Sequence, residues 1–271
     1  MANVPKKDSL GDRMKQNYED RTRFSLPRRT YTIMRVDGRA FHTWTKGLDK
    51  PYDKDFMDRM DAAAVRLCQE VSGTQFAFVQ SDEISLLATD FDDEATQSWF
   101  DGNIQKWVSV GASIAATAFN QVVANRAAPG WVEPVDPWSK KQPNATFDAR
   151  VFTIPDYVEV ENYFIWRQKD AERNSVTLLA QAYASHKQLQ GKSTAERHEI
   201  IHAAGDNWAK HPIRFKHGAV IRYKDETEAN NLPENFHLPE RPSRWFMDEK
   251  TPVFTRDRAY LTGLIPRHWS S

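Results

Sequence analysis

The sequence predicts an α+β domain built on an antiparallel sheet. Three observations lead to this class. Two apolar, strand-like stretches carry acidic residues, an amphipathic helical pattern lies between them, and a third strand-like stretch follows a second helical pattern. This order is typical of a split β-α-β-β-α-β unit, in which the helices lie on one face of the sheet.

The first strand is expected at residues 30–37, where an apolar run leads into Asp37. Residues 1–29 before it are polar and charged. Within them, Ser9 is placed to cap a short helix, because a serine side chain accepts a hydrogen bond from the first helical turn. Pro27 ends any helix before the strand begins.

A helix is expected at residues 54–71, because its apolar residues recur at helical spacing on one face. Asp53 is placed to cap this helix. Cys68 falls on the apolar face and is expected in the core. The segment 75–89 then predicts two strands joined at the acidic turn 81–83.

The second helix of the unit is expected from residue 96 to residue 125, where apolar and small residues form a stripe. An irregular loop rich in proline and tryptophan is expected at 126–144. The strand at 147–154 would complete the unit, with Pro155 as its end.

Three elements are expected after this unit: a long helix at 158–184, a short helix with a capping box at 193–205, and a strand at 217–224. Residues 1–224 are therefore expected to form one domain with a helical insertion at 158–205. Residues 225–271 are rich in proline and charge, so we expect an extended tail packed on the domain.

Composition limits the class of protein. The 271 residues include 37 basic and 37 acidic side chains, and a balanced charge neither requires nor excludes RNA, because only a local basic stripe matters. The single cysteine excludes an internal disulfide framework and fits a reducing compartment. No apolar run could span a bilayer, and the amino terminus lacks the apolar core of a signal peptide. We expect a soluble, cytoplasmic protein without a membrane partner.

Three acids lie in or beside the apolar strands: Asp37 in the first, and Asp82 and Glu83 at the hairpin. A carboxylate in an apolar strand is costly unless it is paired or holds a metal. Acids on neighbouring strands would form a hard oxygen site for Mg²⁺, and two such ions serve phosphoryl or nucleotidyl transfer. Each stretch alone is also explained by turn chemistry, with Asp37-Gly38 as a turn dipeptide and 81–83 as a hairpin loop.

Several segments resemble the tRNA-His guanylyltransferase family over about residues 11–224. They are RVDGRAFHTW at 35–44, KPYD at 50–53, SDEISLL at 81–87, FDARVFTIP at 147–155, YFIWRQKDAERNS at 163–175 and FKHGAVI at 215–221. The resemblance implies a polymerase-palm-like (ferredoxin-like) fold and the addition of nucleotides in the 3′-to-5′ direction.

The resemblance also implies a role for each matching residue. Asp37 and Asp82 would hold two Mg²⁺ ions with the Gly38 carbonyl as a further ligand, and Glu83 would be a third acid needed for full activity. The implied contacts with the triphosphate and base of the incoming nucleotide come from Ser81 and from the turn formed by Asp37, Gly38, Arg39, Ala40, Phe41 and His42. Lys50 and Lys106 are the implied phosphate contacts, and Arg35 is a further, weaker candidate.

The implied substrates are ATP, GTP and the 5′ end of a tRNA. ATP would adenylylate a 5′-monophosphate, and the 3′-hydroxyl of GTP would then attack and release AMP. A tRNA with a 5′-triphosphate would skip the activation. Both steps are displacements at phosphorus that need an activated hydroxyl and a neutralised leaving oxygen.

Two departures from the family pattern matter. Eukaryotic members carry His-Ile-Asn-Asn in the long helix, tied to tRNA-His, whereas this chain has Glu172-Arg173-Asn174-Ser175, and a glutamate would repel phosphate. The chain is therefore most similar to the bacterial and archaeal guanylyltransferase-like branch, which repairs tRNAs truncated at the 5′ end by templated addition. In addition, more basic residues would be expected around Asn103.

Alternative functions stay open from the sequence. Within the enzyme class, a dedicated tRNA-His guanylyltransferase would add G without a template, and a nucleotide cyclase on a related palm is more distant. A non-catalytic nucleotide- or RNA-binding protein is the competing class, although such a protein does not need three clustered acids. The resemblance further implies a homo-oligomer, expected as a tetramer.

Overall fold

A computed structural model describes residues 9–121, 144–224 and 245–268. Six strands form one antiparallel sheet in the order β4-β1-β3-β2-β5-β6. The first four strands are β1 (Tyr31–Gly38), β2 (Thr74–Gln80), β3 (Glu83–Ala88) and β4 (Phe147–Ile154). Their order, β4-β1-β3-β2, confirms the predicted β-α-β-β-α-β unit.

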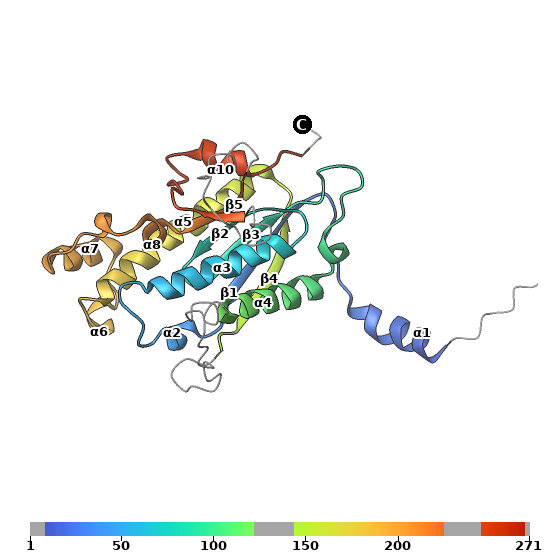
Figure 1. Cartoon of the computed structure of the whole chain (residues 1–271), viewed down its shortest axis with the longest axis horizontal. Helices are drawn as coiled ribbons and strands as arrows, with labels where there is room; N and C mark the ends of the chain where they lie inside the picture. The colour runs from blue at the N-terminus through green and yellow to red at the C-terminus, as the bar shows by residue number, and fades with distance from the viewer. Residues whose placement is uncertain (1–8, 122–143, 225–244, 269–271) are drawn as a thin grey trace, which may run out of the picture.

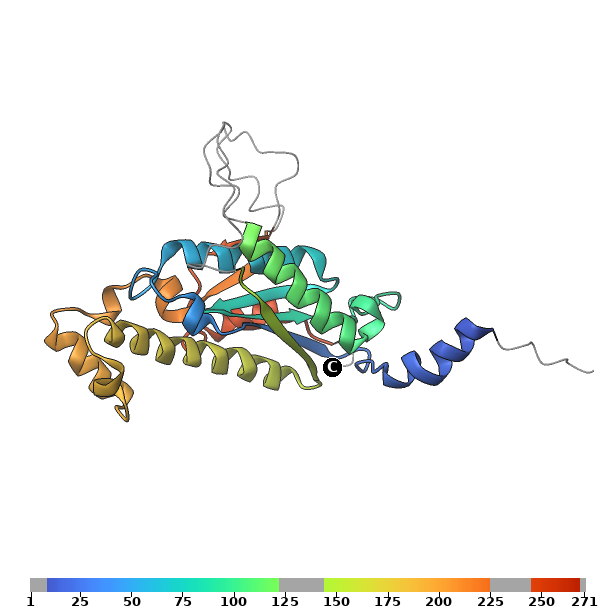
Figure 2. The same ribbon diagram turned by 90° about the horizontal axis from the view of Figure 1, so that it is seen from below.

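Two helices of this unit cover one face of the sheet, as expected (Figure 2). They are α3 (Lys54–Glu70) and α4 (Ile104–Gln121). Alternate strand residues such as Met34, Val36 and Leu86 are fully buried against them, because successive strand side chains point to opposite faces. Asp53 caps α3 as predicted and accepts a hydrogen bond of 2.9 Å from the Phe56 N–H.

Helix α4 begins later than the sequence suggested. The expected start at residue 96 is wrong, because a 3₁₀ turn, η3 (Trp99–Gly102), precedes the helix and three of its four residues have positive φ. Asn103 then accepts a hydrogen bond of 3.0 Å from the Lys106 N–H, which is the geometry of a helix cap. The predicted loop at 126–144 lies, except for its last residue, outside the described residues.

The long helix α5 (Tyr157–Gln181) lies on the opposite face of the sheet (Figure 2). It packs on the other set of alternate strand residues, including Ile33, Phe76 and Leu87. Its last turns form a second small core with the elements that follow in the chain. These are α6 (His186–Leu189), α7 (Thr194–Ala203), η4 (Trp208–Lys210) and α8 (Ile213–His217).

The C-terminal segment contains regular elements where an extended tail was expected. Strand β6 (Trp245–Asp248) pairs with β5 (Ala219–Tyr223), and helix α10 (Arg258–Leu264) follows. The segment is fixed to α5, since the Phe254 N–H donates to the Gln168 side chain at 2.6 Å. So short a strand is stabilised chiefly by its neighbour, and its own residues gave little sign of it.

The N-terminal helical arm extends away from the sheet (Figure 1). It consists of α1 (Leu10–Met14), η1 (Lys15–Glu19) and η2 (Asp20–Thr22), all of whose residues are exposed. Ser9 caps it as predicted, accepting from the Asp12 N–H at 3.1 Å. Within the described ranges, no helix is both long and apolar enough to cross a membrane.

Candidate active site

Asp37 and Asp82 meet at one end of the sheet. Asp37 lies near the end of β1, directly opposite Glu83 on β3 and Asp148 on β4. Asp82 lies with Ser81 in the two-residue loop between β2 and β3. The Gly38 N–H donates to the Asp82 carbonyl at 3.0 Å, which ties the two acid-bearing segments together. Thus the hairpin turn that turn chemistry suggested at 81–83 is formed by Ser81 and Asp82, and it brings Asp82 close to Asp37.

Both carboxylates are held where their charge is unfavourable. Burial, with a smaller contribution from the negative charge of Asp148, raises the pKa of Asp37. Burial raises the pKa of Asp82, and the charge of Asp37 adds to the effect. A nearby cation would lower both pKa values again, because an opposite charge favours the ionised form.

The pair fits a divalent cation in its donor chemistry. Neither Asp37 nor Asp82 makes an ion pair with Lys or Arg in the part of the chain described here. Unpaired, partly buried carboxylate oxygens are what Mg²⁺ prefers, and this ion usually takes one or two of them and completes its shell with water and substrate phosphates. Among the described residues no group of three or more His, Cys, Asp or Glu side chains could hold a metal.

Glu83 is committed to another partner. Arg167 on α5 donates hydrogen bonds of 2.7 and 2.8 Å to its two oxygens, and both side chains are more than nine-tenths buried. Ser85 donates a further bond of 3.3 Å, and the Arg35 guanidinium is 3.9 Å away. Glu83 therefore lies beside the two aspartates as predicted, but its charge is already balanced by arginine.

The turn after Asp37 is tightly packed. The Gly38 position has no room for a side chain, because a Cβ there would lie 2.4 Å from the Phe41 ring. Phe41 itself is buried in an aromatic cluster at the start of α2 (Phe41–Trp44). Ala40 has a left-handed φ of 55°, and the Arg39 N–H donates to the Thr146 carbonyl at 2.9 Å. The Phe41 ring thus requires glycine at position 38.

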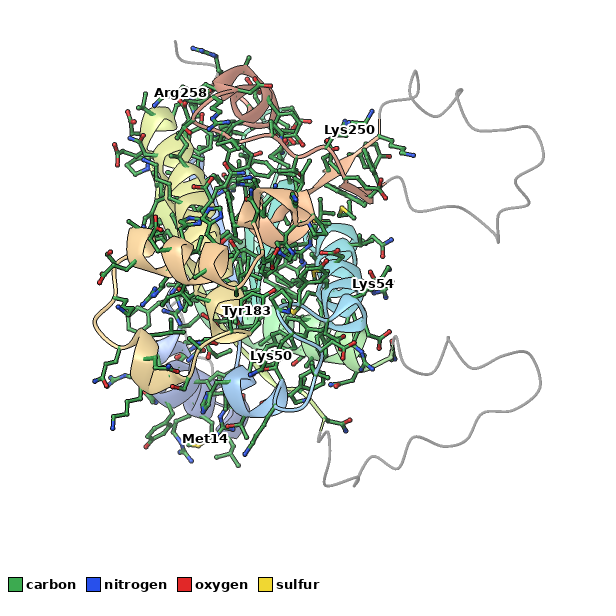
Figure 3. The ribbon with its side chains drawn as sticks, turned by 90° about the vertical axis from the view of Figure 1, so that its left-hand side faces the viewer. Met14, Lys50, Lys54, Tyr183, Lys250 and Arg258 are labelled. Atoms are coloured by element: carbon green, nitrogen blue, oxygen red, sulfur yellow. The ribbon has the colours of Figure 1, made fainter. Side chains whose placement is uncertain are left out.

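A cavity of about 540 Å³ lies beside the two acids. It brings together five of the residues predicted for the nucleotide: Phe41, His42, Lys50, Ser81 and Asp82. Figure 3 views the end of the molecule at which the labelled Lys50 lies, close to α2. The volume is that of a small-molecule site, and its wall carries both apolar and polar groups.

The far wall of this cavity was not predicted. It is formed by α5 and α8, through residues that include Ala171, Asn174, Leu178 and Arg214. Asn174 donates to Gln80 at 3.4 Å, and Arg214 is held by Asp61 of α3 at 2.8 Å. These partners are far apart in the chain, so no local pattern predicts that they meet. The polar middle of the long helix was the sequence feature that could have pointed to this wall.

Lys106 is not part of this site. It lies in the first turn of α4, where its ammonium is 5.2 Å from the centre of the Phe100 ring. That end of α4 is joined to the residues before β1, since the Ile104 N–H donates to the Phe24 carbonyl at 3.0 Å. Asp37 is near the opposite end of β1, a strand of eight residues and so about 26 Å long. The structure therefore does not bring Lys106 to the cavity or to the two aspartates.

The predicted effect of Glu172 also changes. Its carboxylate lies 3.0 Å from His217 Nδ1 at the packing of α5 against α8, with only a third of the side chain exposed. The Trp208 ring packs edge to face against the same imidazole, with ring centres 5.4 Å apart. Glu172 therefore stabilises the packing of α5 against α8 through His217.

Comparison with known proteins supports the fold and identifies the family. The family model described as tRNA-His guanylyltransferase matches residues 11–155, more than half of the chain. The structure of a bacterial tRNA(His) guanylyltransferase-like protein in complex with ATP is 38% identical, covers 96% of this chain and 100% of its own, and has a TM-score of 0.79. The corresponding complex with GTP is 36% identical over the same shares, with a TM-score of 0.71. The tRNA(His) guanylyltransferase of Schizosaccharomyces pombe is 27% identical over 78% of this chain and 81% of its own length.

Proposed function

Because the chain belongs to the tRNA-His guanylyltransferase family of nucleotidyltransferases, we propose that it adds nucleotides to the 5′ end of tRNA in the 3′-to-5′ direction. The observation that carries this proposal is the cavity that Lys50, His42 and Ser81 share with Asp82, next to Asp37. It joins a nucleotide-sized space to two carboxylates that, among the described residues, form no ion pair with lysine or arginine.

The reaction has two displacements at phosphorus. The 5′-monophosphate of the RNA attacks the α-phosphorus of ATP and releases pyrophosphate, which leaves an adenylylated 5′ end. The 3′-hydroxyl of the incoming nucleotide then attacks the 5′-phosphorus, and AMP leaves. Lys50 and the turn from Asp37 to His42, with Ser81, hold the triphosphate, so that the attacking oxygen is positioned in line with the bond that breaks.

Magnesium is the proposed cofactor. Asp37 and Asp82, with the Gly38 carbonyl, would hold two ions, and the ions when bound would activate the attacking hydroxyl and neutralise the leaving oxygen. The structural support is the raised pKa of both aspartates, which a cation would lower again. Glu83 supports this site through its bond to Arg167 and is not proposed as a ligand.

For the biological role we propose templated repair of truncated tRNA 5′ ends. Similarity supports this choice, because the chain is 38% and 36% identical to the bacterial guanylyltransferase-like structures and 27% identical to the S. pombe tRNA(His) enzyme. In templated repair, base pairing selects the nucleotide, so the protein does not need to read the RNA sequence. The alternative is a dedicated tRNA-His guanylyltransferase that adds the extra 5′ G.

One experiment separates these roles. Purified protein with Mg²⁺, ATP and labelled nucleotides is given tRNA-His without its extra G, and a different tRNA without its first nucleotide. Faster repair of the truncated tRNA, with each added nucleotide matching the opposite base, is the expected result. A preference for tRNA-His regardless of the opposite base would support the alternative, and bound GTP without incorporation on either RNA would support a binding protein.

We also propose a homotetramer in the cytoplasm. A single palm-sized domain is small beside a tRNA, so several copies would be needed to contact the substrate along its length. The single, fully buried cysteine fits a reducing compartment. Light scattering of the purified protein tests the assembly, and a monomer at assay concentration would contradict it. Fluorescence microscopy of the tagged chain in its own cell tests the compartment.

A further inference from the structure

Trp166 is an exposed aromatic residue that the reaction described above does not use. It lies on α5 with 48% of its surface accessible to solvent, although tryptophan is usually well buried. Lys169, one turn further along the helix, and Arg173, two turns further, are exposed as well. A single exposed apolar side chain needs no explanation by itself, so the argument depends on how the ring is held.

The indole ring is fixed by two contacts. The Arg167 guanidinium lies 4.3 Å from the ring centre, and that guanidinium is itself anchored by Glu83 and by Asp170 at 2.8 Å. The Tyr163 ring meets the indole edge to face, with centres 5.8 Å apart. Arginine stacking covers one side of the ring, and the high exposure means that the indole keeps an open surface. The result is a flat, pre-positioned aromatic surface.

The position of this surface relates it to the acids. Arg167 connects Trp166 to Glu83, and Glu83 lies directly opposite Asp37 across β1 and β3. The nucleotide cavity is elsewhere: the α5 residues that line it begin at Ala171, about 7.5 Å further along the helix axis, and Trp166 is not among them. Trp166 is thus near the carboxylates and outside the space proposed for the incoming nucleotide.

We propose that Trp166 is a stacking platform for the base at the 5′ end of the RNA, which rests on the proposed function of the site. Stacking on an aromatic ring accepts any base, as templated repair of different tRNAs requires. Lys169 lies one helical turn further along α5, and the half-exposed Arg173, which is bonded to Asp170 at 2.6 Å, lies two turns further, where phosphates of the same strand would pass. The 5′ terminal phosphate would then be near Asp37, and the nucleotide would enter from the cavity.

Binding of RNA hairpins tests this without any chemistry. The probe is an acceptor-type stem with a 5′-monophosphate, compared with the same stem whose 5′-terminal nucleotide lacks its base. Trp166→Ala is expected to raise the Kd of the intact hairpin about tenfold and to leave the Kd of the abasic hairpin unchanged. Trp166→Phe should keep most of the affinity, whereas Trp166→Leu, which is apolar but not flat, should behave like Ala.

Val158→Ala is the matched control, because Val158 is an exposed apolar residue on the same helix. It should change neither Kd. Equal losses on the intact and abasic hairpins, a loss of GTP affinity in Trp166→Ala, or dissociation of a wild-type oligomer in that variant would each overturn the proposal. Failure of the wild type to add nucleotides would refute the proposed function but not an effect of Trp166 on RNA binding.

Discussion

Arg167 donates two hydrogen bonds to the carboxylate of Glu83, at 2.7 and 2.8 Å, across 84 positions of the chain. This buried pair joins α5 to the first residue of β3, next to Asp82. It therefore fixes one of the two acids relative to the helix that forms the far wall of the cavity.

Breaking this pair is predicted to be costly. Glu83→Ala would leave the Arg167 charge buried without its main partner, so the free energy of unfolding should fall by about 3–5 kcal/mol. Urea denaturation measures the change. Glu70→Gln is the control, because the Arg66–Glu70 pair is half exposed and should contribute about 0–1 kcal/mol. Equal losses of unfolding free energy in the two variants would contradict the prediction that the buried pair contributes more to stability than the exposed pair.

The two aspartates are predicted to be essential for catalysis. Asp37→Asn and Asp82→Asn should each lower the rate of nucleotide addition at least about a thousandfold, because the charge that would hold the metal is lost. Circular dichroism and Tm should show an intact fold, and the rise in Tm caused by Mg²⁺ in the wild type should disappear. Nucleotide addition at the wild-type rate by either variant would refute the metal site.

The pH dependence of stability should report the same carboxylates. The folded state raises the pKa of Asp82, chiefly by burial, so it keeps its proton at a pH where the unfolded chain has lost it. Without divalent cation, the contribution of Asp82 to stability is therefore present below the ordinary aspartate pKa and is lost as pH rises through the raised value. The difference in unfolding free energy between wild type and Asp82→Asn should fall over that window and should be flat above it.

Mg²⁺ should reverse this loss, because it favours the ionised carboxylates. Denaturation curves at several pH values, with Mg²⁺ and with EDTA, measure both effects. A difference between wild type and Asp82→Asn that does not change with pH would contradict the raised pKa.

Gly38 is predicted to tolerate no side chain. Gly38→Ala would place a Cβ 2.4 Å from the Phe41 ring, so the turn after Asp37 must shift. We expect a lower Tm and a loss of nucleotide addition of at least tenfold, since small displacements of a catalytic group are costly. Gly263→Ala in α10 is the control, because no atom lies within 4 Å of its Cβ, and it should leave activity unchanged.

Lys50 and Lys106 are predicted to differ. Lys50 lines the cavity, so Lys50→Ala should raise the KM for the triphosphate about tenfold through loss of a charged contact. Lys106 is at the other end of the sheet, so Lys106→Ala should leave this KM unchanged. Steady-state kinetics with GTP at saturating RNA tests the pair. A rise in KM with Lys106→Ala alone would contradict the placement of the nucleotide.

The sequence by itself determined the unit of four strands and two helices and the meeting of two acids. Both follow from local rules: strand alternation and helical spacing decide which residues are buried, and Asp53 and Ser193 mark helix starts through bonds to residues three positions away. Because β1 and β3 are neighbours in such a unit, Asp37 was bound to lie near the hairpin of Asp82.

Only the tertiary structure decided the rest. The partner of Glu83, the cavity wall on α5 and α8, and strand β6 all depend on contacts between residues far apart in the chain, which no local period reveals. Lys106 shows the same: the helical pattern did not tell at which end of β1 it would lie, and the packing of the start of α4 beside Phe24 placed it away from the site. The periodicity of the sequence predicts which side of a helix or strand is buried, whereas the tertiary packing decides which elements that side contacts.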